Sequence, residues 1–162
     1  MIPHFLVWLQ SLPFALDIRR STWLFPTIET IHVLFIVIVV GSVSMFDLRL
    51  LNIASRDRAV TDLYEEIIPW TWASFACAAV AGFLLFSSDA VKYYHNIPFR
   101  MKMLLLLLVG LNTAFFQFRI YPRAGSWTAG ARIPFAAKFA ATFSLVFWIA
   151  IVACGRWIGF TK

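Results

Sequence analysis

The chain has 162 residues, of which 61% are hydrophobic, 17% are aromatic and 14% are charged. Soluble domains are about 45–50% apolar and about 25% charged, and a fold of this size cannot hide so much apolar surface from water. The composition therefore excludes a soluble domain, a disulfide-rich secreted scaffold and a disordered chain, and it predicts a protein surrounded by lipid.

The formal net charge is +6, from 14 Lys and Arg against 8 Asp and Glu. Most of the basic residues stand at the ends of apolar runs, where long side chains reach the lipid phosphates. We therefore interpret the basic excess as membrane anchoring and expect no nucleic-acid partner. Cys77 and Cys154 both lie inside apolar runs, so no disulfide is expected.

Residues 1–20 predict an amphipathic helix that lies in the headgroup plane, apart from the membrane spans. Its apolar positions recur at spacings of three and four and form one stripe: Phe5, Trp8, Leu9, Leu12 and Leu16. Pro13 is the point at which this helix can break.

Four apolar segments follow, and each has the roughly 20 residues that a spanning helix needs. Within the domain 21–162, the spans are expected at about residues 22–46, 67–88, 99–121 and 134–155. Nothing alternates with a period of two, which excludes a membrane β-barrel. The predicted fold class is all-α: an integral membrane four-helix bundle with an N-terminal interfacial helix, forming a homo-oligomer.

The ends of the spans give two further expectations. Residues 52–66 carry mixed charge and predict a short surface helix, and Pro69 is expected in the first turn of the second span. The basic residues divide evenly between the two sides of the bundle, so the positive-inside rule gives no orientation.

Glu29 and His32 are one turn apart on one face of the first span. An ionisable group inside a span is costly unless it is paired, which makes this couple the leading functional candidate. The structural alternative is a neutral His32 satisfied by a neighbouring helix, with Glu29 near the headgroups. Asn112 and Gln117 in the third span are expected to form interhelical hydrogen bonds.

A b-type haem is the cofactor that suits these residues best, because axial ligation needs only single, well-placed histidines. His32 is expected to be one ligand of the iron, and His95, between the second and third spans, to be the other. Glu29 would hold the second nitrogen of His32, and Arg100 and Lys102 would receive the haem propionates. A di-iron site fails because the chain has a single Glu-x-x-His pair, and no catalytic residue is assigned.

The predicted function is electron transfer within the membrane, with a quinone or a redox protein as partner. Two alternatives remain open. In a non-enzymatic accessory or assembly subunit, Glu29 and His32 would form a buried polar lock. In a proton-coupled transporter they would form a relay, although the chain predicts neither broken helices nor an inverted repeat.

Several stretches resemble a family of small bacterial inner-membrane proteins of unknown function. They are residues 21–32 (STWLFPTIETIH), 47–51 (DLRLL), 69–72 (PWTW), 93–102 (YYHNIPFRMK) and 110–112 (GLN). The resemblance implies four spans in the bacterial cytoplasmic membrane and no assigned activity. It marks as signature positions Glu29, His32, Asp47, Arg49, Asn96, Phe99, Lys102 and Asn112. A looser similarity to four-helix membrane cytochromes b rests on architecture and on the first-span histidine.

Overall fold

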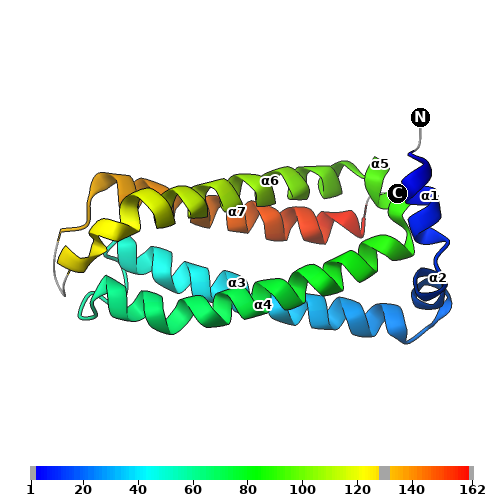
Figure 1. Cartoon of the computed structure of the whole chain (residues 1–162), viewed down its shortest axis with the longest axis horizontal. Helices are drawn as coiled ribbons and strands as arrows, with labels where there is room; N and C mark the ends of the chain where they lie inside the picture. The colour runs from blue at the N-terminus through cyan, green and yellow to red at the C-terminus, as the bar shows by residue number, and fades with distance from the viewer. Residues whose placement is uncertain (1–2, 128–131, 161–162) are drawn as a thin grey trace.

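The computed structural model describes residues 3–127 and 132–160. All regular elements in those ranges are helical, which confirms the all-α prediction. Four long helices run along the long axis of the molecule (Figure 1). They are α3 (Leu24–Leu50), α4 (Val60–Ser88), α6 (Ile97–Phe115) and α7 (Phe135–Ile158). Each is long and apolar enough to cross a membrane, α6 together with the turns that follow it to Gly125. The protein is a multi-pass membrane protein.

The long helices form two hairpins, α3 with α4 and α6 with α7. Packing of α3 along α7 joins the two hairpins, whereas the backbones of α4 and α6 stay apart over their described lengths. Buried residues of the core lie mainly where the hairpins meet: Val39, Val109, Trp148 and Ile151 at mid-bundle, and Phe46, Leu63, Phe116 and Ala140 towards one end. The bundle is therefore closed on the α3–α7 side and more open on the α4–α6 side.

The start of α4 differs from the prediction. The helix begins at Val60, so the surface helix expected over residues 52–66 is wrong. Val60 and Leu63 are fully buried in the core, and this apolar face extends α4 by two turns beyond the hydrophobic run. Pro69 consequently lies inside the helix and not in its first turn, where it removes one backbone hydrogen bond.

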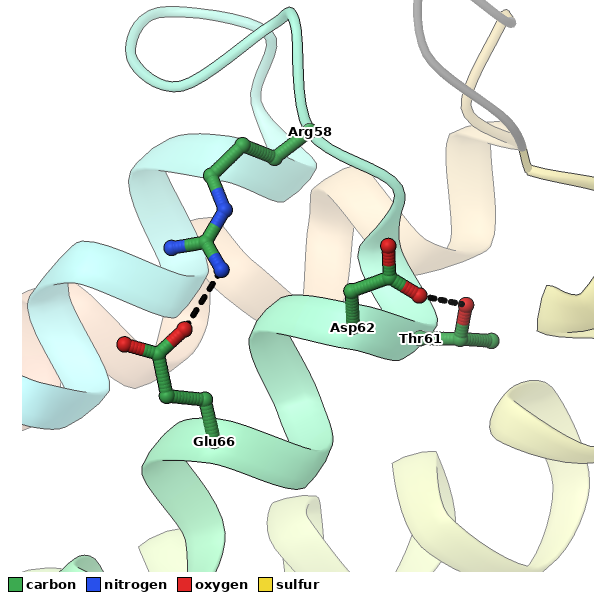
Figure 2. A network of polar contacts seen from close by, with 4 residues as sticks. All are labelled: Arg58, Thr61, Asp62 and Glu66. Atoms are coloured by element: carbon green, nitrogen blue, oxygen red, sulfur yellow. Dashed lines mark hydrogen bonds and ion pairs between the residues drawn. The ribbon is translucent and has the colours of Figure 1, made fainter.

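Residues 51–59 form the loop between α3 and α4, with left-handed backbone at Asn52 (φ 58°) and Ser55 (φ 51°). Figure 2 shows how the end of this loop is tied to α4: Arg58 forms an ion pair with Glu66. In the first turn of α4, the Thr61 hydroxyl donates a hydrogen bond to the Asp62 carboxylate (Figure 2). The Arg58–Glu66 ion pair thus joins the end of the loop to the second turn of α4.

Three short helices cover the opposite end of the bundle: α1 (His4–Gln10), α2 (Pro13–Arg20) and α5 (Ala90–His95) (Figure 1). The break at Pro13 is confirmed. The single stripe on α1 needs correction, because Leu6 and Leu9 pack against α5 while Phe5 and Trp8 are exposed. Helix α1 thus packs one face against the bundle and leaves an aromatic face exposed, as expected for a helix that lies at the level of the lipid headgroups.

The third span also departs from a regular helix. After α6 the chain forms one π-helical turn, η1 (Phe116–Ile120), and then a 3₁₀ turn, η2 (Tyr121–Ser126). The span stays continuous to Gly125, and what differs from a regular α-helix is its hydrogen-bonding pattern. Single π turns within helices are uncommon and occur frequently at functional sites.

Candidate functional site

His32 contacts the neighbouring helix α4. Its Nδ1 lies 2.8 Å from the carbonyl oxygen of Ala78, and because a carbonyl only accepts, Nδ1 must carry the proton. One turn further along α4, Gly82 makes room for the ring: a Cβ at that position would lie 2.8 Å from His32 Cε1. The structure thus forms the contact expected for the structural alternative, and it leaves Nε2 of His32 unprotonated in the neutral ring.

Glu29 does not form a hydrogen bond with His32 in the described part of the chain, and its side chain is exposed. Its carboxylate lies instead near Tyr93 of α5: burial raises the pKa of the Tyr93 hydroxyl, and the carboxylates of Asp89 and Glu29 raise it further. Lys102 of α6 interacts electrostatically with His32 and reaches α7, where a Cβ at Gly155 would lie 3.8 Å from its Nζ.

The structure does not bring His95 to His32. Gly82, beside His32, stands six residues before the end of α4, about 9 Å of helix rise, and α5 follows beyond that end. The His95 imidazole is exposed at the end of α5 and packs edge-on against the Tyr94 ring, with 5.3 Å between ring centroids. Arg100 is exposed as well. Among the described residues, no group of three or more His, Cys, Asp or Glu could hold a metal ion.

A cavity of about 430 Å³ lies between all four long helices, towards the end that carries the 51–59 loop. On α3 its wall runs from Val39 to Leu50, so the cavity follows the helix for about 16 Å from mid-bundle towards this end. Exposed aromatic residues of α4 and η1, Trp72, Phe75 and Phe118, stand among the lining residues. The cavity therefore opens between α4 and the α6–η1 segment, on a side that faces lipid in a membrane.

Asp47 is the most unusual residue of this cavity. Its side chain comes from the last turns of α3 and is only 5% exposed, and it is hydrogen-bonded to the Ser144 hydroxyl of α7. Its second oxygen, Oδ2, has no hydrogen-bond partner among the described residues. A buried polar atom without a partner costs free energy, and because Oδ2 is itself inaccessible, the Asp47 side chain has to turn for this oxygen to meet a donor in the cavity.

Other polar groups surround the same space. The side-chain amide of Asn112 donates a hydrogen bond to the Ala140 carbonyl (3.0 Å), which confirms the interhelical bond expected for this residue. Gln117 lines the cavity from the π turn, and Thr71 lines it from α4. The cavity thus combines an apolar wall with a few polar groups from different helices.

Asp47 was not predicted to be a site residue from the sequence. The resemblance marked it as a signature position, but its place at the end of an apolar run suggested a charge that meets the headgroups. The available signal was a carboxylate with apolar neighbours, Phe46 and Leu48, on both sides. Nothing in the sequence indicates that Ser144, nearly a hundred residues later, would be its partner.

Comparison with known proteins gives a family and no activity. The model of a family of unknown function, DUF6644, matches residues 22–161. No curated protein and no solved structure matches the chain. The family match covers the four long helices and both candidate sites, and it agrees with the resemblance to a family of unknown function. The chain belongs to this family of unknown function (DUF6644).

Proposed function

We propose that this protein binds a lipophilic small molecule that enters from the bilayer. The observation that supports this function is the cavity between the four helices, with the unpartnered Oδ2 of Asp47 in its wall. Binding sites for small molecules are typically cavities of about 300–1,000 Å³ with a mainly apolar wall and a few polar groups that orient the ligand.

The shape of the cavity indicates how such a molecule would lie. Val39 and Trp148 line it at mid-bundle, and both are buried apolar residues that would contact a chain or ring system. Asp47 lies eight residues beyond Val39, about 12 Å along α3, and would contact the polar group of the ligand. A ligand with an apolar part and one polar group would dissolve its apolar part in the bilayer before it enters the cavity.

Filling the cavity tests this proposal. Gly110 lines the cavity, and a Cβ at that position meets nothing within 4 Å, so Gly110→Leu places a side chain at the cavity wall without a clash at its Cβ. Gly41 is the matched control, because it is also helical and also has open space around an added Cβ, but it does not line the cavity. Both substitutions remove a helical glycine and should preserve folding.

Three labelled probes of equal chain length, decanol, decanoate and decylammonium, are titrated into the protein in phosphatidylcholine nanodiscs, with empty nanodiscs subtracted. We expect saturable binding of at least one probe to the wild type and to Gly41→Leu, and at least about tenfold weaker binding to Gly110→Leu. Uptake equal to that of empty nanodiscs for all three probes, or unchanged binding by Gly110→Leu, would contradict the proposal.

A second proposal is electron transfer by haem b, which uses the same contact of His32 that the structural alternative explains. Histidines that bind metals usually donate their other ring N–H to a carbonyl or carboxylate, as His32 Nδ1 does to Ala78. His95 lies apart from His32, so the proposal keeps His32 as its ligand and no longer relies on His95. Absorption spectra of protein purified with ample haem test it: a Soret band should be present in wild type and His4→Ala and absent in His32→Ala. A colourless wild-type protein would reject it.

Both proposals place the chain in the bacterial cytoplasmic membrane, on the strength of the family resemblance. A quinone or redox protein would be the partner in the haem proposal alone.

A further inference from the structure

We propose that the ligand of the cavity is a lipophilic organic cation, an amine or ammonium compound whose charged group pairs with Asp47. The inference rests on the proposed binding function and adds the chemical class of the ligand. It follows from three features of the cavity: Asp47 is the one charged side chain among its described lining residues, the Oδ2 atom of Asp47 has no partner among the described residues, and aromatic rings form part of the wall.

The described residues that line the cavity carry one acidic side chain and no basic one. Among the described residues that line the cavity, Asp47 is the one acidic side chain, and none is Lys, Arg or His. Arg49 is the nearest basic residue in sequence. Its Nε and Nη1 donate to the carbonyl of Arg58 and to the Asn52 side chain in the 51–59 loop, its Nη2 is buried without a partner, and within the described ranges it forms no ion pair with Asp47. The protein therefore supplies no counter-ion to Asp47 in this cavity, and a positively charged ligand would supply it.

Burial makes an unpaired charge at Asp47 costly, and a cation that enters the cavity would offset that cost because opposite charges attract more strongly at low dielectric than in water. Ser144 satisfies one carboxylate oxygen, whereas Oδ2 is buried without a partner among the described residues and has to turn towards the cavity to meet a second donor. An ammonium group provides both the N–H and the charge, a neutral alcohol provides the donor alone, and a carboxylate ligand would be repelled.

Aromatic rings surround the same part of the cavity. Phe46, next to Asp47 in the chain, packs edge-on against Tyr64 and Phe116, with ring centroids 5.6 Å and 5.7 Å away. All three rings line the cavity, as does Trp148. Aromatic faces attract cations, and rings combined with a carboxylate form the usual binding site for ammonium groups.

Selectivity between charged and neutral probes tests the inference in the same nanodiscs. At neutral pH we expect the wild type to bind decylammonium at least about tenfold more tightly than decanol, and decanoate more weakly than either. Asp47→Asn keeps the shape of the side chain but removes its charge, so it should bind decylammonium and decanol about equally. Asp62→Asn is the matched control, because Asp62 is exposed and lies outside the cavity, and it should behave as the wild type.

Equal binding of decanol and decylammonium by the wild type would overturn the inference, and so would a cation preference that persists in Asp47→Asn. The comparison of probes on the wild-type chain requires no variant, so the test stands even if Asp47→Asn does not fold. Decanol binding that Gly110→Leu abolishes, without a preference for the amine, would leave the proposed binding function intact and reject only the ligand class.

Discussion

Arg49 illustrates how one buried charged side chain organises a loop. It is fully buried at the end of α3, where the sequence had suggested a basic residue that reaches the headgroups. Its Nε donates to the Arg58 carbonyl (2.8 Å), and its Nη1 donates to Oδ1 of Asn52 (2.9 Å), which has left-handed backbone. Both partners belong to the 51–59 loop, so Arg49 acts as an internal anchor of that loop.

Arg49→Lys should therefore destabilise the protein although it conserves the charge. A lysine ammonium cannot reproduce the planar arrangement of guanidinium donors, and losing hydrogen bonds from a charged group should cost about 2–3 kcal/mol of unfolding free energy. Unfolding in mixed micelles measures this cost, and faster tryptic cleavage after Arg58 should accompany it. Arg20→Lys is the control: Arg20 is exposed in α2, at the other end of the bundle from the 51–59 loop, and its replacement should cost less than about 0.5 kcal/mol. Equal costs for the two variants would contradict the role of Arg49.

The apolar sequence of α3 does not distinguish residues that face the core from residues that face lipid. Val37 and Val39 belong to the same apolar run of α3, yet Val37 is 63% exposed and Val39 is 2% exposed. In a soluble helix, polar residues would mark the outer face, but in a membrane both faces are apolar because lipid and core are equally apolar. The apolar run therefore predicts the span and does not predict which residues line the cavity.

Helices α3 and α4 pack closely where the His32 ring meets Gly82. The second span is rich in Ala and Gly, which permit close approach of helices, and the structure places Ala78 and Gly82 against the imidazole. The partner of His32 could not be predicted, because it is a backbone carbonyl and carries no side-chain signature.

Gly82→Ala should weaken this contact. The added Cβ would lie 2.8 Å from Cε1 and 3.3 Å from Nδ1 of His32, so the ring must move away from the Ala78 carbonyl. We expect a loss of about 1–3 kcal/mol of unfolding free energy in mixed micelles. In the His32→Ala background the same substitution should cost much less, since the clash is gone.

Gly41→Ala is the control for helix propensity, since its added Cβ meets nothing within 4 Å. It should leave stability unchanged or raise it by up to about 1 kcal/mol. The same cost for Gly82→Ala with and without the imidazole would show that the contact contributes nothing.

Helix ends were the part of the elements that the sequence predicted least well. The polar residues that precede Pro69 suggested a boundary, but Val60 and Leu63 form a buried face that becomes visible only once α4 packs against the core. The π turn at residues 116–120 likewise has no sequence signal, because it contains neither proline nor glycine.

The arrangement of the four long helices confirms the predicted four-span architecture. This architecture determines which parts of the chain lie on the same side of the membrane. The link between α1 and α2, which begins at Ser11, and the end of α7, which Gly159 follows, lie at the end of the bundle that α1, α2 and α5 cover, and the 51–59 loop lies at the other end (Figure 1). In a membrane, the first two positions should be accessible from one side and the loop from the opposite side.

Cysteine labelling in sealed vesicles checks this topology. Single cysteines at Ser11 and Gly159, in a background without Cys77 and Cys154, should react with an impermeant maleimide from the same side, and a cysteine at Ser55 from the other. The experiment also supplies the orientation that the even distribution of basic residues left open. Labelling of all three positions from one side would contradict the four-span arrangement.

The mouth of the cavity between α4 and the α6–η1 segment has a thermodynamic consequence. A molecule that arrives through hydrocarbon is governed by its mole fraction in the membrane, and its concentration in water matters only through partitioning. Apparent affinities measured against the total concentration of ligand would then fall as lipid is added, because the lipid dilutes the ligand, while affinities expressed as mole fraction in the lipid would stay constant. The occupancy of such a protein would report the chemical composition of the membrane in which it is dissolved.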